Sequence, residues 1–260
     1  MKTFKQICRE IKKLEIQGAE DVAIYGLKAY SLKPKKSSIR KLLRLRKTEP
    51  MLRNALKFAE RNSVKEALER IRKDGELIAN YGKKLIKNNY KIFTHCHSST
   101  VIDILREAKK NKKKFIVYNT ETRPLFQGRK TAKELSRLKI KVTTVVDSGA
   151  RIALTKMGKV NLMLIGADAI LRDKVINKIG SGMFAQIAYD NKIPVYVAAH
   201  SWKYTPEVEI EERSFHEIWK RAPKHVKIRN LAFESIPRKF IKGIICEKGV
   251  LSYAQFLKKK

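Results

Sequence analysis

From Lys91 onward the chain repeats one pattern, in which a short apolar run is followed by an amphipathic stretch and then by another apolar run. Apolar runs of about four to eight residues are typical of buried strands, and longer amphipathic stretches are typical of helices. Strands that alternate with helices predict a parallel sheet with helices on both faces. The runs are KIFTHC, KFIVYN, KVTTVV, NLMLIGAD, PVYVAA and GIICE, and the main amphipathic stretches are VIDILREAKK, TAKELSRL and GMFAQIAYDN.

The first third of the chain has a different period. Apolar residues recur there at helical spacing over residues 4–14, 52–59 and 64–86. An asparagine pair interrupts this pattern just before the first apolar run. We therefore expect an α/β protein with a helical N-terminal domain over residues 1–88 and a Rossmann-like α/β domain over residues 89–260, which carries most of the functional site.

Length and composition favour a globular protein, because 260 residues with 43% hydrophobic side chains can bury a sizeable core. No apolar run is long enough to span a membrane, and the N-terminus lacks the apolar run of a signal peptide, so we expect a soluble, cytoplasmic protein. Cys8, Cys96 and Cys246 are far apart and form no Cys-x-x-Cys pair. This spacing predicts free thiols rather than a disulfide framework or a zinc ribbon.

The net charge is strongly positive, at +34 from 59 Lys and Arg against 25 Asp and Glu. Such a charge predicts attraction to phosphate-rich partners. The cations are spread through KPKKSSIRKLLRLRK, KKNKKK and the terminal KKK, without the interleaved aromatic residues of a dedicated reader of bases. The charge therefore leaves open an RNA or ribosome contact and a solvated surface suited to anionic substrates.

The segments that follow the predicted strands contain most of the plausible chemistry, because ligands bind beyond the carboxyl ends of parallel strands. Cys96 ends one apolar run and Asp168 ends another, so a thiol and a carboxylate could face each other there. Such a pair moves a proton between neighbouring carbons if cations lower the pKa of the thiol and burial raises that of the carboxyl group. The alternative is a small buried thiol and a helix-capping carboxylate.

Two other segments could hold phosphate groups or sugar hydroxyls. One lies before a predicted helix and contains Arg123, Gln127, Arg129 and Lys130. Capping and surface ion pairs are the alternative there. The other contains Asn177 and Lys178, followed by a Gly-x-Gly at a predicted helix start. That Gly-x-Gly is weak evidence for a dinucleotide site, because the third glycine and the later acidic residue are missing.

The histidines beside Cys96 suggest a metal site or a nucleophile with its base. On a strand, however, His95 and His97 point to one face and Cys96 to the other, so the three cannot ligate one ion without a sharp bend. Only His200 lies at another strand end to complete a set. The same divergence argues against a Cys-His nucleophile. We expect neither a metal ion nor a redox cofactor.

Taken together, the segments THCHSST, TETRPLFQGRKTAKEL, VVDSGA, GADAI, VINKIG and IRNLAFESIP resemble one family. It contains ribose-1,5-bisphosphate isomerase, methylthioribose-1-phosphate isomerase and the alpha, beta and delta subunits of initiation factor 2B. IQGAEDVA and RKTEPMLRNAL resemble its N-terminal motifs, so the resemblance spans nearly the whole chain. It implies that Cys96 is the base that takes a proton from the carbon next to the anomeric centre. It also implies that Asp168 is the acid that opens the ring by protonating its oxygen.

The resemblance also implies a set of substrate contacts. Gly18 and Ala19 match the Arg-Gly-Ala turn with Gln17 in the arginine position, Arg46 matches the arginine of Arg-Pro-Thr, Ser98, Ser99 and Thr100 follow the cysteine, Gln127 matches the glutamine of Gln-Gly, Asn177 and Lys178 match the Asn-Lys pair that holds the sugar phosphate, and Lys203 matches a lysine near the distal phosphate.

Two departures from the family pattern bear on function. Gln17 replaces a guanidinium that would hold a phosphate bidentately, and Lys47 replaces the proline of Arg-Pro-Thr. The chain also looks short in its helical part, as in archaeal initiation-factor-2B-like members. We expect an isomerase of a phosphorylated pentose, converting ribose 1,5-bisphosphate to ribulose 1,5-bisphosphate, that forms a homodimer or higher homo-oligomer. The alternative is a regulatory subunit that binds initiation factor 2 or RNA, or that senses a sugar phosphate or nucleotide.

Overall fold

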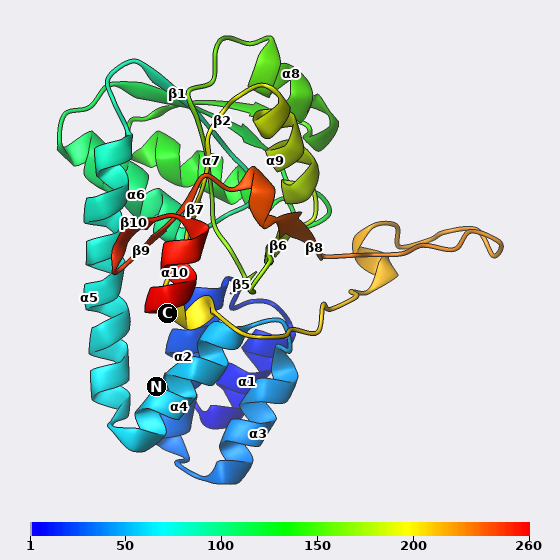
Figure 1. Cartoon of the computed structure of the whole chain (residues 1–260). Helices are drawn as coiled ribbons and strands as arrows, with labels where there is room; N and C mark the ends of the chain where they lie inside the picture. Colours follow the sequence, from blue (N-terminus) through cyan, green and yellow to red (C-terminus); the bar gives the residue numbers. More distant parts are fainter. Residues whose placement is uncertain (1) are drawn as a thin grey trace.

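Five helices form the N-terminal third of the protein, and the computed structural model describes residues 2–260 (Figure 1). Hydroxyl groups cap two of these helices, because Thr3 accepts the backbone N–H of Gln6 and Ser63 accepts that of Glu66. The last helix is the longest and runs beside both the other helices and the sheet (Figure 1). The five are α1 (Phe4–Lys12), α2 (Ala19–Leu32), α3 (Lys36–Leu45), α4 (Pro50–Arg61) and α5 (Val64–Gly82).

The main sheet has seven strands in the order β10-β9-β7-β4-β1-β2-β3. All its neighbouring strands are parallel except the hairpin of β9 and β10. The chain moves from β1 outward to β3, then returns to β4 on the other side of β1 and moves outward to β9. The topological switch point therefore lies between β1 and β4. The strands are β1 (Tyr90–Thr94), β2 (Phe115–Thr120), β3 (Lys141–Val145), β4 (Leu162–Ile165), β7 (Val195–Ala198), β9 (Gly243–Cys246) and β10 (Gly249–Leu251).

The central strands are buried on both faces, so their side chains alternate between two cores. In β4, Leu162 and Leu164 belong to the core on one face, whereas Met163 and Ile165 belong to the core on the other. The first face is covered by α5, α6 (Ser99–Lys110) and α7 (Gln127–Arg137). The second is covered by α8 (Ala150–Thr155), α9 (Ser181–Asp190) and α10 (Tyr253–Lys259).

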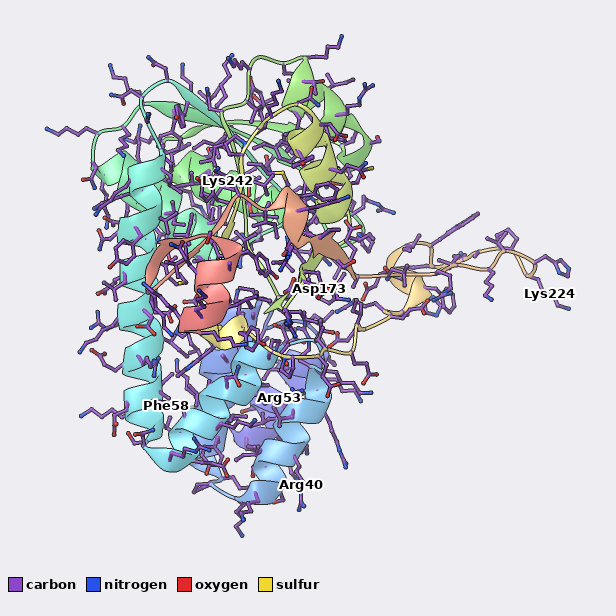
Figure 2. The ribbon with its side chains drawn as sticks, viewed as in Figure 1. Arg40, Arg53, Phe58, Asp173, Lys224 and Lys242 are labelled. Atoms are coloured by element: carbon purple, nitrogen blue, oxygen red, sulfur yellow. The ribbon has the colours of Figure 1, made fainter. Side chains whose placement is uncertain are left out.

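A second, smaller sheet and a long arm complete the fold. The small sheet is antiparallel and places β6 between β5 and β8. Residues 206–232 form an arm that extends away from the body of the protein (Figure 1), with Lys224 near its outer end (Figure 2). The arm exposes large apolar side chains, including Phe215 and Trp219. The small-sheet strands are β5 (Ala169–Ile170), β6 (Lys174–Lys178) and β8 (Phe233–Pro237).

The predicted fold class is confirmed, since helices precede a mostly parallel sheet and each of the six apolar runs contains a strand. The small antiparallel sheet and β10 were not predicted. The division into two domains at residue 88 stays a prediction. Among residues 2–260, no helix combines the length and the apolar character that a membrane crossing requires.

Candidate functional site

The switch point brings the two predicted proton-transfer residues to neighbouring strands. β1 and β4 pair directly, with Ile92 opposite Leu162 and Phe93 opposite Met163. β1 ends two residues before Cys96, and β4 ends three residues before Asp168. Both residues therefore lie beyond the carboxyl ends of adjacent parallel strands, where open α/β sheets bind ligands.

A cavity of about 650 Å³ opens at this place, between the helices of the N-terminal third and the strand ends. Of the thirteen predicted site residues, twelve line it: Gln17, Gly18, Ala19, Arg46, Cys96, Ser98, Ser99, Gln127, Asp168, Asn177, Lys178 and Lys203. Thr100 does not; it is buried and lines a separate, much smaller cavity. The structure thus gathers the predicted set from segments far apart in the sequence, with this one exception.

Cys96 has an unusual backbone conformation, with φ at 65° in the left-handed region. Two threonines hold it there, because its N–H donates to Thr122 Oγ1 at 3.0 Å and its carbonyl accepts from Thr131 Oγ1 at 2.8 Å. The strand has ended by this point, so the alternation expected for KIFTHC does not extend to the cysteine. A tight turn, rather than strand pleating, aims the thiol into the cavity.

The flanking histidines are occupied by other partners. His95 is buried, with Nδ1 2.5 Å from Thr120 Oγ1 and Nε2 2.9 Å from the carbonyl oxygen of Ile179. Since a carbonyl only accepts, Nε2 carries the proton and Nδ1 accepts from the threonine. His97 pairs through Nδ1 with Thr131 Oγ1 at 3.1 Å. Burial lowers the pKa of each histidine to about 4, so both rings are neutral at pH 7.

The electrostatics of the two predicted proton-transfer groups match the sequence-based expectation only in part. Burial raises the pKa of Asp168, although Lys203, Lys178 and Arg46 oppose that shift. Burial also raises the pKa of Cys96, to about 11, and Lys178 only partly offsets it. Lys178 therefore acts in the direction that the sequence-based hypothesis requires, but desolvation outweighs its attraction and the thiol pKa is raised rather than lowered.

Two buried lysines supply positive charge to the cavity. Lys178 lies on β6 with Nζ 5.2 Å from the centroid of the Phe233 ring. Lys203 donates from Nζ to the carbonyl oxygen of Ala167 at 2.6 Å, directly before Asp168. Asn177, next to Lys178, donates to Ser181 Oγ at the start of α9. Burial of both lysines and the hydrogen bond of Lys203 hold these two cations at the cavity.

Arg46 lies between two carboxylates that the sequence did not point to. Its Nη2 donates to Glu49 Oε1 at 2.8 Å, and its Nε lies 3.5 Å from Glu211 Oε1. Glu49 also lines the cavity and is only 2% exposed. Nothing in the local sequence marks Glu49 as a site residue, since a glutamate before a helix that begins at Pro50 is an ordinary start signal.

The N-terminal turn contributes backbone more than charge. Gly18 has φ at 87°, a conformation that favours glycine, and precedes α2. Gln17, in the position of the family's arginine, turns its side chain back and donates from Nε2 to the carbonyl of Leu14 at 2.6 Å. It lines the cavity without presenting a cation to it.

The segment before α7 contributes fewer residues than expected. Gln127 and Lys130 line the cavity, but Arg123 and Arg129 do not. Arg129 instead pairs with Glu121 at 2.7 Å. The start of α7 packs closely against the end of β2, and only a glycine fits there. A Cβ on Gly128 would lie 1.8 Å from the Thr120 carbonyl oxygen.

The fold and site together define a Rossmann-like α/β protein with a charged ligand cavity at the switch point of its sheet. Residues 33–253 match the model of the Initiation factor 2 subunit family, and the chain belongs to this family. Ribose 1,5-bisphosphate isomerase of Methanocaldococcus jannaschii is 34% identical over 96% of this chain and 92% of its own. The enzyme of that name from Archaeoglobus fulgidus is 32% identical over 96% and 90%.

Among solved structures, the translation initiation factor eIF-2B of Pyrococcus horikoshii OT3 superposes with a TM-score of 0.86 at 29% identity, over 96% of each chain. These findings confirm the predicted family. The isomerase names support the prediction of an enzyme of the aldose-ketose isomerase class. The roles of individual residues and the homo-oligomer stay predictions.

Proposed function

We propose that this protein isomerises a phosphorylated pentose, with ribose 1,5-bisphosphate as the substrate and ribulose 1,5-bisphosphate as the product. The observation that carries the proposal is the position of Cys96 and Asp168 beyond adjacent strands, in one cavity with Lys178 and Lys203. Relatives that match nearly the whole chain and bear the name ribose 1,5-bisphosphate isomerase support this substrate.

In the proposed reaction, the Cys96 thiolate takes the proton from C2 while Asp168 protonates the ring oxygen, and the ring opens to an enol phosphate. Cys96 then returns its proton to C1. The C2 hydroxyl gives its proton back to Asp168 and becomes the ketone. One hydrogen has moved from C2 to C1, no electron has left the site, and both side chains regain their starting states.

The two groups act as one titrating pair in this mechanism. The charge of Asp168 raises the pKa of Cys96, so the protonation state of the carboxyl group affects that of the thiol. Transfer of the thiol proton to the Asp168 carboxylate creates base and acid together without adding net charge to a buried site. Lys178 favours this state because its charge stabilises the thiolate.

The remaining predicted contact residues are assigned to the two phosphates or to the sugar hydroxyls according to their chemistry. Asn177 and Lys178 are the proposed partners of one phosphate, together with the first turn of α6 at Ser98 and Ser99, where free backbone N–H groups favour an anion. Lys203 and Arg46 are the proposed partners of the other phosphate. Gln127 and the Gln17–Ala19 turn are proposed to contact sugar hydroxyls.

The test is to incubate the purified full chain with ribose 1,5-bisphosphate and to measure the formation of its isomer, ribulose 1,5-bisphosphate. Cys96→Ser and Asp168→Asn should each reduce turnover by about a thousandfold or more, as expected for loss of a proton-transfer group. Cys8→Ala removes a thiol from the helical core and should retain turnover. A wild-type protein that turns over no pentose phosphate would sink the proposal.

A second candidate is a regulatory subunit that contacts initiation factor 2. It is favoured by the likeness to the eIF-2B of Pyrococcus horikoshii OT3 and by the net charge of +34. Co-purification of initiation factor 2 from native extract at moderate salt, combined with absent turnover, would favour it. Binding that disappears as salt is raised would indicate charge alone.

A further inference from the structure

The candidate cavity is not basic, although the chain as a whole is. Its lining contains as many acidic as basic side chains. The basic ones are Lys2, Arg46, Lys130, Lys178, Lys203 and Arg213, and the acidic ones are Glu10, Glu15, Glu20, Asp21, Glu49 and Asp168. An excess of cations would strengthen the binding of a bisphosphate. The acidic groups in the lining therefore need an explanation in terms of which ligands the cavity binds.

The effect of these acidic groups is clearest at Arg46, a residue that is 6% exposed and whose guanidinium is already paired. Glu49 binds one side of it at 2.8 Å, and Glu211 lies 3.5 Å away on another. Within residues 2–260, Arg46 Nη1 and Glu49 Oε2 are buried without any hydrogen-bond partner. A buried arginine with a free N–H group is an anion site, and a buried carboxylate beside it opposes the same anion.

Glu211 reaches this place because the base of the arm is fastened to the segment after Arg46. Thr48 Oγ1 donates to the carbonyl oxygen of Glu209 at 2.8 Å and lies 3.1 Å from the N–H of Glu211. These contacts hold the second carboxylate near Arg46 independently of Glu49. The arginine is therefore enclosed by carboxylates from two separate parts of the chain.

We propose that Glu49 is a specificity-determining residue whose carboxylate competes with a substrate phosphate for Arg46, so that a second phosphate binds there only when Glu49 is protonated. This deepens the proposed function, because it concerns the same cavity and the same sugar phosphates. Under this proposal the cavity distinguishes ligands by their number of phosphates. A pentose monophosphate binds whether or not Glu49 is protonated, whereas a pentose bisphosphate binds with uptake of one proton.

The charged groups around Glu49 are consistent with this role. Burial is the largest cause that raises the pKa of Glu49, Arg46 and Lys203 oppose it, and Asp168 and Glu211 add to it, so that the pKa is about 7. Below pH 7 the carboxyl group is neutral and leaves Arg46 to the ligand. Above pH 7 it is ionised and repels a phosphate. A phosphate dianion beside Glu49 raises its pKa again, which is the cause of the proton uptake.

The experiment is calorimetry with ribulose 1,5-bisphosphate and with ribulose 5-phosphate, from pH 7 to 8.5, in two buffers of different ionisation enthalpy. Over this range the phosphates themselves remain dianions. We expect bisphosphate affinity to fall by up to about tenfold per pH unit as Glu49 ionises, with uptake of up to one proton. Monophosphate affinity should change by less than about twofold, because its single phosphate does not need Arg46.

Three variants separate this role from a structural one. Glu49→Gln keeps the acceptor for Arg46 Nη2 and removes the charge, so it should bind the bisphosphate about tenfold more tightly at pH 8.5 and lose the pH dependence. Glu211→Gln should act in the same direction with a smaller effect. Glu209→Gln removes an exposed carboxylate of the same segment, one that pairs with Lys47, and should behave like wild type.

The outcomes also distinguish this inference from the proposed function. Proton-coupled bisphosphate binding without turnover would support the role of Glu49 while contradicting the isomerase. Turnover with equal pH dependence for both ligands, or an unchanged pH profile in Glu49→Gln, would overturn the role of Glu49 and leave the isomerase intact. In an active protein, the pH effect should appear in KM for the bisphosphate rather than in kcat.

Discussion

The Ser99 hydroxyl donates a hydrogen bond to the Glu20 carboxylate at 2.7 Å and so joins the first turn of α6 to the first turn of α2. One helix follows the candidate base and the other belongs to the N-terminal helices. The contact therefore closes one side of the cavity with a bond between segments 79 positions apart.

Ser98 and Ser99 are adjacent in sequence but should respond differently to alanine. Ser98 caps α6 by accepting the N–H of Val101, so Ser98→Ala should lower the free energy of unfolding by about 1 kcal/mol, measured by urea denaturation. Ser99→Ala breaks the hydrogen bond to the Glu20 carboxylate that closes one side of the cavity and should raise KM about tenfold, as expected for loss of a hydrogen bond to a charged group. Equal effects of both variants on KM would contradict this division.

The reactivity of Cys96 should report the charge on Lys178. With a pKa of about 11, the thiol should alkylate about tenfold faster per pH unit between pH 7 and 9. Lys178→Met removes a cation that lowers this pKa, so labelling by iodoacetamide should slow several-fold. Lys130→Met removes a cavity lysine that does not act on Cys96 and should leave the rate unchanged. Mass spectrometry shows which cysteine carries the label. The label should be on Cys96, because the other two thiols are buried.

Two glycine-to-alanine substitutions should change the free energy of unfolding in opposite directions. At Gly128 a Cβ would lie 1.8 Å from the Thr120 carbonyl oxygen, so Gly128→Ala should destabilise the fold by about 3 kcal/mol or more. At Gly75, inside α5, a Cβ would meet nothing within 4 Å. Gly75→Ala should therefore stabilise by about 0.5 to 1 kcal/mol. Urea midpoints of both variants measure the difference.

Acid should weaken the fold before the carboxylates titrate, because the folded state keeps His95 and His97 neutral. Burial lowers the pKa of both to about 4, whereas the unfolded chain binds a proton at each below about 6.5. Their contribution is fully present above pH 6.5 and is lost as the pH falls toward 4, by up to about 3 kcal/mol per histidine.

The test is the urea midpoint at pH 7.5 and pH 5. His97→Gln should reduce the pH dependence, and His216→Gln, which changes an exposed histidine, should not. A wild-type midpoint that stays constant from pH 7.5 to 5 would show that these histidines are protonated in the folded state as well.

The main sheet could be predicted because its central strands, such as β4, are buried on both faces and so form nearly continuous apolar runs. The edge strand β3 is largely exposed, and its run KVTTVV was recognised by its β-branched residues. The strands of the small sheet carry no such signal. In β6, Asn177 and Lys178 are buried polar residues whose strand pairing with β8 depends on a segment more than fifty positions away. Sequence patterns with a local period cannot report such a pairing.

The candidate site divides in the same way. Cys96 and Asp168 were predictable, because strand ends at a switch point are where open sheets bind ligands. Glu49 and Glu211 were not, since their importance arises only when the base of the arm packs against the segment after Arg46 and both carboxylates lie beside that arginine. The pKa of Cys96 was also out of reach, because it depends on how completely the folded protein excludes water from the thiol.

Because the backbone at Cys96 is left-handed, the residue that would be best for the stability of the fold differs from the residue that the proposed activity needs. A side chain there costs the fold about 1 kcal/mol relative to glycine, since only glycine adopts this conformation without strain. Laboratory evolution of this protein for heat resistance alone should therefore favour Cys96→Gly, a change that strengthens the scaffold and removes the thiol. Thermostable variants selected under a requirement for turnover should instead keep the cysteine and improve elsewhere.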